Sequence, residues 1–220
     1  MRLNNKLLSE YGGILLEGCV ASGCEVNAET FKGSKNSSLK VLNISFGSKK
    51  IVVPIAFCGQ DRAEVNLQKS LFEKALIGKV ELLLDDGMQY SAVLTGIGDE
   101  EYVGSQVLKV KYTFLGMKHG EYKIVSGNAV YCDSTLPYTD CILKATASMD
   151  AAAYKVDSVT FKNVLAGEEL CVDGINGRIL VNGVPAAERA DWIEFPKLVP
   201  GINSMQCSDE LTVEFYPVYF

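Results

Sequence analysis

The feature that most constrains the fold is a succession of short segments in which apolar and polar residues alternate, separated by turn sequences. Residues 80–84 and 88–94 flank Asp85-Asp86-Gly87, and residues 179–181 precede Asn182-Gly183. Alternation with a period of two places one apolar face along a strand, and Asp-Gly and Asn-Gly are strong hairpin signals. The pattern therefore predicts a mainly β protein, with a sandwich in the C-terminal half, where strands recur every 8–12 residues.

One segment in the N-terminal half has a helical period instead. Leu67, Leu71 and Phe72 fall on one face of a helix expected near residues 66–78, together with Ala75 and Leu76. Asp61 or Asn66 is suited to cap its start. The order hairpin, helix, hairpin, strand predicts an α+β first domain and excludes a doubly wound fold.

A domain boundary is expected where the chain becomes polar and rich in glycine, between Gly116 and Pro137. This gives a first domain over residues 1–125, with the single helix, and a second domain over residues 126–220.

The charge balance makes nucleic-acid binding improbable as a function. The formal net charge is −6, the sequence pI is about 5.0, and no run of lysines or arginines occurs. No segment has the pattern of a signal peptide or a membrane span, so the seven cysteines are expected to be reduced thiols, mostly buried as small apolar residues. Cys19 and Cys24 form the one close pair, and without a second pair we expect no metal site and no cofactor.

The sequence also offers no convincing catalytic site. His119 is the sole histidine, lies in the expected linker and is predicted to be exposed. No Gly-x-Ser-x-Gly motif accompanies it. Asp85 and Asp86 are better explained by a hairpin turn than by acid–base catalysis. The chain is therefore expected not to be an enzyme.

The last thirty residues are apolar and aromatic up to the end of the sequence, whereas chain ends are usually polar and frayed. This segment is expected to be held in a sheet or an interface. It contains Phe195-Pro196-x-Leu198-x-Pro200-Gly201-x-Asn203 and closes with Tyr216-Pro217; upstream lie Asp173 and the Asn182-Gly183 hairpin. Together these motifs resemble the C-terminal domain of siphophage distal tail (Dit) proteins.

The resemblance implies an architectural function. Members of that family form a hexameric ring through their N-terminal domains, with galectin-like sandwiches projecting outward. The ring joins the tail tube to tail-tip, baseplate or receptor-binding proteins, and DNA passes through its channel. The chain would then be a phage or prophage virion protein, made in the bacterial cytoplasm and located in the tail. An acidic protein suits such a channel, because a repulsive wall does not retain DNA.

The N-terminal half resembles the family less specifically. Where family members often have a glycine-rich polar turn after an early strand, this chain has Lys32-Gly33-Ser34-Lys35.

A carbohydrate-binding module for host-surface adhesion is the alternative prediction. Sugar sites often present an aromatic ring beside polar side chains, and Trp192 lies between Asp191 and Glu194 at the expected start of a strand. Trp192 is therefore the candidate glycan contact, although a packing role is the more common one for a lone tryptophan.

Overall fold

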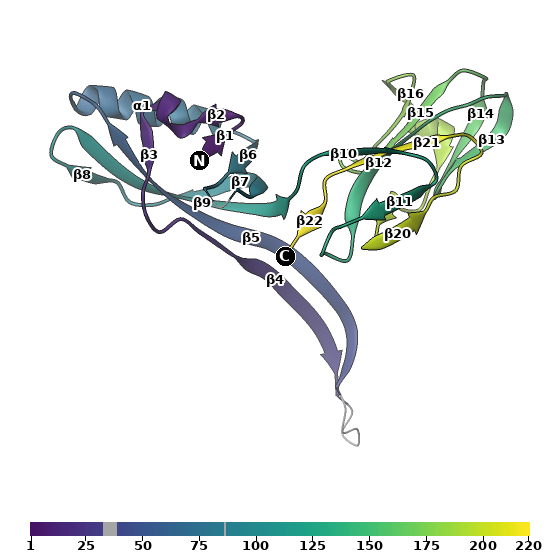
Figure 1. Ribbon diagram of the computed structural model, residues 1–220, viewed down its shortest axis with the longest axis horizontal. Helices are drawn as coiled ribbons and strands as arrows, with labels where there is room; N and C mark the ends of the chain where they lie inside the picture. The colour runs from purple at the N-terminus through teal and green to yellow at the C-terminus, as the bar shows by residue number, and fades with distance from the viewer. Residues whose placement is uncertain (33–38, 86) are drawn as a thin grey trace. The chain divides into compact units, whose positions relative to one another are not determined.

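A computed structural model describes residues 1–32, 39–85 and 87–220. It separates into two compact units, Met1–His119 together with Phe220, and Gly120–Tyr219 (Figure 1). The expected boundary lay after residue 125, whereas the strand that ends the first unit stops at His119. Strands dominate both units, which confirms the prediction of a mainly β protein.

The N-terminal unit is built on one large antiparallel sheet. Its strands follow the order β2-β1-β6-β7-β9-β5-β3, with β4 joined to β5 and β8 joined to β9. The strands of this sheet are β1 (Arg2–Leu3), β2 (Lys6–Leu7), β3 (Gly13–Leu15), β4 (Val20–Phe31), β5 (Lys40–Cys58), β6 (Lys79–Leu83), β7 (Gln89–Ile97), β8 (Glu101–Val103) and β9 (Val107–His119). A short 3₁₀ turn, η1 (Leu8–Tyr11), links β2 to β3.

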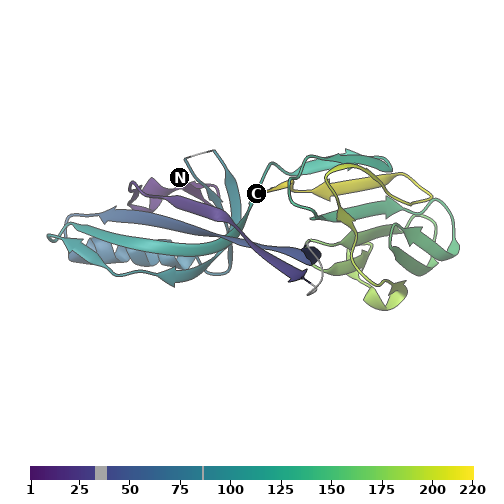
Figure 2. The ribbon, with the colours of Figure 1, turned by 90° about the horizontal axis from the view of Figure 1, so that it is seen from below.

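The helix of this unit, α1 (Arg62–Ala75), lies against one face of the sheet (Figure 2). It begins four residues before the expected range, because Asp61 caps it by accepting a hydrogen bond from the Glu64 backbone N–H at 2.9 Å. Its buried face is formed by Val65 and Phe72. Of the predicted face, Phe72 and Leu76 are buried and Ala75 packs against the core, whereas Leu67 and Leu71 are 60% and 52% exposed. The prediction was therefore wrong for these two leucines.

The core of the N-terminal unit lies between α1 and the sheet. The ring of Phe72 packs against Phe57 and Tyr112 at centroid distances of 5.6 and 5.2 Å. All three side chains are fully buried. The Tyr112 hydroxyl reaches Glu73 of the same helix at 3.2 Å, which satisfies its polar atom at the edge of the core.

The C-terminal unit consists of β strands and one 3₁₀ turn, η2 (Ala187–Arg189). Its main sheet has the order β10-β21-β12-β15-β16-β17, with β19 paired to β12; a second sheet has the order β13-β14-β18, and β11 pairs with β20. The strands are β10 (Lys123–Ser126), β11 (Ala129–Cys132), β12 (Thr139–Thr146), β13 (Ala151–Val156), β14 (Val159–Val164), β15 (Glu169–Asp173), β16 (Arg178–Val181), β17 (Val184–Pro185), β18 (Ala190–Asp191), β19 (Lys197–Leu198), β20 (Gly201–Ser204), β21 (Leu211–Phe215) and β22 (Val218–Tyr219).

The sheets of this unit enclose one hydrophobic core. Leu143 and Phe215 from the main sheet and Phe161 from the second sheet are fully buried in it. Strand β21 lies inside the main sheet, paired with β10 on one side and β12 on the other. The apolar end of the chain is thus part of the sheet structure.

Candidate assembly surfaces

The most unusual element of the N-terminal unit is a long two-stranded ribbon, which we call the arm (residues 24–31 of β4 and 40–48 of β5). Strand β5 pairs with β9 only from Lys49 onward, so in the arm β4 and β5 pair with each other. In Figure 1 the arm runs away from the end of the sheet that carries α1. Residues 33–38, which include most of Lys32-Gly33-Ser34-Lys35, lie outside the described residues.

The two faces of the arm differ in chemistry. Val26 lies opposite Phe46 and Ala28 lies opposite Ile44, so their side chains share one face. Val26 and Ile44 are 55% and 49% exposed. The other face carries Asn27 opposite Ser45, and Glu29 opposite Asn43. The arm is therefore amphipathic. On its apolar face Phe46 packs against Phe220 at a centroid distance of 4.9 Å, whereas Val26 and Ile44 are open to solvent.

A second exposed apolar surface lies on the outer side of α1. Leu67 and Leu71 are four residues apart and therefore adjacent on the helix. Lys74, one turn beyond Leu71, is exposed on the same side. We call Leu67, Leu71 and Lys74 the helix stripe. Sequence periodicity identified these leucines but assigned them to the core, because Phe72 lies beside Leu71 in the sequence.

The negative charge of the chain is concentrated in the C-terminal unit. Residues 1–119 contain fourteen lysines and arginines against thirteen aspartates and glutamates, and residues 120–219 contain seven against fourteen. The formal net charges are +1 and −7. The N-terminal unit, which is expected to form the ring, is therefore not acidic, and a repulsive channel wall does not follow from the net charge of the chain.

The Pro200-Gly201 turn owes its shape to Asn203. The Asn203 Oδ1 accepts the Val199 N–H at 2.8 Å, and Nδ2 donates to the carbonyls of Val199 and Gly201 at 2.8 and 3.1 Å. Gly201 has φ = 97°, a left-handed conformation that favours glycine. The buried Asn203 side chain thus replaces backbone partners that the turn lacks.

Two further motif positions shape turns in the main sheet. Asp173 ends β15 and its carboxylate accepts hydrogen bonds from the backbone and side chain of Asn176 at 2.9 and 2.8 Å. Asn182 and Gly183 both have positive φ, as a two-residue hairpin turn between β16 and β17 requires. The Asn182 side chain also accepts the Glu169 N–H at 2.9 Å.

The remaining motif residues lie around β19 and β22. Pro196, Leu198 and Pro217 are buried, whereas Phe195 is half-buried and Tyr216 exposed. The Pro196 carbonyl lies 3.5 Å from Cys141 Sγ, and the Pro217 carbonyl accepts the Gly120 N–H at 2.8 Å. The Ser134 hydroxyl accepts the Val218 N–H at 3.0 Å, which attaches β22 to the C-terminal unit. The motif residues are thus placed as packing and turn residues.

Trp192 lies in the loop after β18 and does not start a strand as expected. Its ring is 6.1 Å from that of Phe195, and its side chain is 38% exposed. The neighbouring Ile193 is fully exposed. The loop therefore presents an apolar surface to solvent.

A polar network that the sequence did not reveal joins β12, β21 and Tyr122, the residue before β10, on the outer face of the main sheet. Glu214 accepts hydrogen bonds from the Tyr122 hydroxyl and, at 2.7 Å, from Lys144 Nζ. The rings of Tyr122 and Tyr216 lie 4.7 Å apart. Partial burial raises the pKa of Glu214, but Lys144 and Tyr122 outweigh it and hold the pKa below its ordinary value. Tyr122 and Glu214 are far apart in the sequence, so no local pattern could link them.

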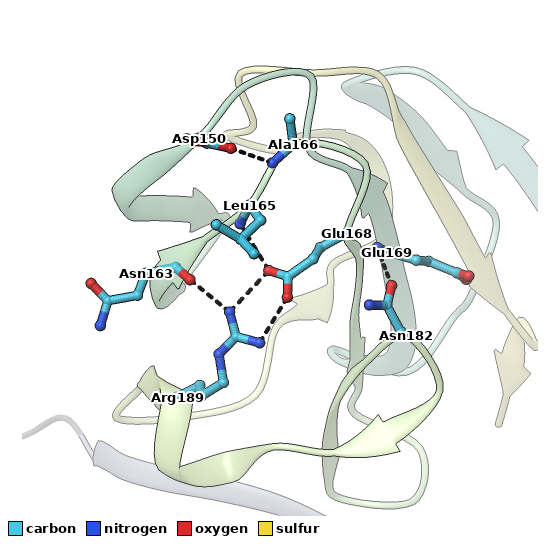
Figure 3. A network of polar contacts seen from close by, with 8 residues as sticks. All are labelled: Asp150, Asn163, Leu165, Ala166, Glu168, Glu169, Asn182 and Arg189. Atoms are coloured by element: carbon cyan, nitrogen blue, oxygen red, sulfur yellow. Dashed lines mark hydrogen bonds and ion pairs between the residues drawn. The ribbon is translucent and has the colours of Figure 1, made fainter.

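A second network fixes the loop between β14 and β15 (Figure 3). Arg189 of η2 binds both carboxylate oxygens of Glu168 at 2.9 Å and also donates to the Asn163 carbonyl at 2.7 Å. The Glu168 carboxylate accepts the Leu165 N–H, and Asp150 accepts the Ala166 N–H. Two parallel hydrogen bonds between an arginine and a carboxylate fix the orientation of both side chains, so this pair holds the loop against η2.

The structure gives no reason to assign catalysis. His119 is buried, not exposed as predicted, and its Nε2 lies 2.9 Å from Glu81 Oε2. The Asp85 carboxylate binds the N-terminal ammonium group at 2.5 Å, and Asp86 lies outside the described residues. Cys132, Cys141 and Cys171 are buried as expected, but Cys58 is exposed. Burial raises the pKa of the Cys141 thiol to about 12, which makes it a poor nucleophile.

No group of three or more His, Cys, Asp or Glu side chains in the described residues is placed to hold a metal ion. None of the helices in that part of the chain has the length and apolar character needed to cross a membrane.

Comparison with known proteins relates this chain to others through its structure. No protein-family model and no curated protein sequence matches it. The crystal structure of the Dit protein (gp 19.1) of phage SPP1 matches with a TM-score of 0.73 at 13% identity, over 99% of this chain and 98% of that one. That protein is described as a paradigm of the hub adsorption apparatus in phages that infect Gram-positive bacteria.

Two structures of the phage P2 baseplate in its activated conformation, with Ca and with Sr, are also similar. Their TM-scores are 0.57 and 0.55 at 8% identity, over 96% and 95% of this chain and 92% and 91% of theirs. The resemblance that the C-terminal motifs predicted is confirmed at the level of the fold: along nearly its whole length the chain is folded like a phage Dit hub protein.

Proposed function

We propose that this chain is a structural protein of a phage or prophage tail, a distal tail hub that joins the tail tube to the tail tip or baseplate. The observation that carries the proposal is the similarity to SPP1 Dit over both units, at a TM-score of 0.73. A shared domain alone would allow many functions, whereas a match across both units in the same order is more specific.

In this proposal the N-terminal units form a hexameric ring, and the C-terminal units, as galectin-like sandwiches, project outward from it. The partners are other copies of the chain, the tail tube protein and tail-tip, baseplate or receptor-binding proteins. DNA only passes through the channel. The protein acts by assembly in the virion tail and catalyses no reaction.

The proposal is tested by measuring the mass of the purified protein in solution across concentration and imaging large species by negative-stain electron microscopy. Six-subunit rings, or stacked pairs of them, are the expected result. If the protein stays monomeric, the same measurement in the presence of the tail tube and tail-tip proteins decides the question. Failure to join either partner would contradict the hub function.

The alternative, a carbohydrate-binding module, is favoured by one observation, the half-exposed Trp192 beside the fully exposed Ile193. A glycan-binding screen with the intact protein tests it. Binding that is lost in Trp192→Ala and kept in the neighbouring Glu194→Ala would support a sugar site.

A further inference from the structure

The arm is joined to the rest of the sheet through two irregularities in the pairing of β4 with β5. Between the pairs Ala21–Ile51 and Cys24–Lys49, strand β4 has one extra residue. In the next interval toward the arm the extra residue is in β5 instead, which restores the original register. Each strand therefore contains one bulge, and a bulge bends a strand and increases its local twist.

The two bulges lie at the place where the arm loses its support. Lys49 is the residue of β5 nearest the arm that still pairs with β9, opposite Gly116. On the sheet side of this pair β5 lies between two strands, whereas on the arm side it pairs with β4 alone. A two-stranded ribbon is only marginally stable, so the least resistance to bending is at this boundary.

Both bulges contain a glycine beside a serine, Ser22-Gly23 in β4 and Gly47-Ser48 in β5. The backbone of Gly23 is not in the left-handed region, and a Cβ added there would have no heavy atom within 4 Å. Neither space nor a strained φ therefore requires glycine at position 23. What glycine does supply there is freedom of the backbone.

Side-chain hydrogen bonds hold the bulge of β4. The Ser22 hydroxyl accepts the Lys50 N–H at 2.9 Å and donates to the Gly23 carbonyl at 3.0 Å. Lys49 Nζ donates to the Ser22 carbonyl at 3.4 Å. A few local contacts thus replace the regular backbone ladder at this point, and they can be exchanged without disturbing the sheet.

One aromatic contact restrains the arm just beyond the bulges. Phe46, opposite Val26, is the first residue of β5 to pair in register on the arm side. Its ring meets that of Phe220 edge to face, at an interplanar angle of 78°. Phe220 groups with the N-terminal unit, so the contact lies within that unit. It covers the root of the apolar face, whereas Val26 and Ile44 remain exposed.

We propose that the paired bulges form a hinge between the arm and the sheet, and that Phe220 is a latch that holds the arm in one direction. When the contact between Phe46 and Phe220 opens, the arm swings about residues 22–23 and 47–48. The device gives the arm a held and a released state within one folded unit. It does not rest on the proposed function.

Spin labels on the arm and on the helix test the proposal in the full-length protein. Genetically encoded reactive amino acids at positions 29 and 70 carry the labels and leave the native cysteines unchanged. Excess unlabelled protein suppresses distances between molecules, and double electron–electron resonance gives the distribution of arm-to-helix distances. We expect Phe220→Ala to broaden this distribution at least about twofold, because the released ribbon is held only at its base. Phe46→Ala should broaden it equally, and the double variant no further.

A second substitution locates the movement. In the Phe220→Ala background, Gly23→Val should narrow the distribution again, because a β-branched residue has less conformational freedom than glycine. Gly96→Val is the matched control, since Gly96 also lies at a bulge, in β7, and an added Cβ would approach the Thr113 Cβ at an ordinary 3.8 Å. It should leave the distribution broad.

A second pair of labels, at positions 70 and 93 outside the arm, should give the same distances in every variant. The melting temperatures should also match the wild type, because none of the substituted residues belongs to either hydrophobic core. An unchanged distribution in Phe220→Ala overturns the latch. Broadening that Gly23→Val fails to reduce overturns the hinge, and broadening of the 70–93 distances overturns both, because the whole unit has then loosened.

Discussion

At the scale of single residues, the C-terminal motif acts through side chains that complete turns. Asn203 is the clearest case, because one buried amide satisfies three backbone groups around Pro200-Gly201. A sequence motif of this kind can be recognised because the hydrogen bonds that shape a turn join residues close together in the sequence.

Replacing Asn203 by alanine should therefore destabilise the C-terminal unit by about 2–3 kcal/mol, the cost of leaving buried backbone groups without partners. Chemical denaturation measures this change. The neighbouring Ser204→Ala, at an exposed position, should change stability little; equal effects of the two substitutions would show that Asn203 has no special role.

Glu214 predicts a pH dependence at the same scale. Its pKa in the folded protein is lowered, so its contribution to stability is present above its ordinary pKa of 4.5 and is lost as the pH falls through the lowered folded value. Acid unfolding followed by circular dichroism should show this loss below about pH 4.5. Glu214→Gln should reduce the slope of stability against pH in that range, and an unchanged slope would contradict the assignment.

At the scale of elements, the sequence predicted strands and hairpins well and the environment of the helix poorly. Alternation and Asn-Gly turns are local signals, so the hairpins around residues 85–87 and 182–183 could be read from them. The buried side of α1 could not, because Leu67 and Leu71 obey the helical period yet face solvent. A pattern of apolar residues does not by itself distinguish a buried face from an exposed one.

The terminal strands give a prediction for deletion. Removing residues 211–220 takes away β21, whose Leu211, Val213 and Phe215 are fully buried between two neighbouring strands. The loss should be comparable to the roughly 5–15 kcal/mol that stabilises a typical domain, because removing each such side chain costs about 2–5 kcal/mol. Deletion should abolish the cooperative melting of the C-terminal unit in calorimetry. A soluble truncation with a normal melting transition would be incompatible with the position of β21.

At the scale of the whole molecule, the two structural units also differ in net charge. The separate hydrophobic cores of the two units predict that each can fold alone. Expressed separately at pH 7, residues 120–219 should bind an anion-exchange column, as their net charge of −7 requires, and residues 1–119 should bind weakly or pass through. Equal retention of the two fragments would contradict this division.

The difference in net charge between the two units could be counted from the sequence only once the domain boundary was known. The total charge of −6 suggested a uniformly acidic protein, although a count by unit reverses that impression for the N-terminal half. The exposed apolar faces of the arm and of the helix stripe could be predicted from the sequence even less well. The two faces of the arm depend on which residues of β4 and β5 stand opposite each other, and residue composition does not encode that register.

The two edges of the arm are also open to pairing with other chains. In the described residues, the outer edges of β4 and of residues 40–48 of β5 have no neighbouring strand, so their backbone groups can template pairing with other chains. Charged residues on an edge strand oppose such growth, and Glu25, Glu29 and Lys40 stand in those positions. Charges at these edges make pairing of the arm with strands of other chains less favourable.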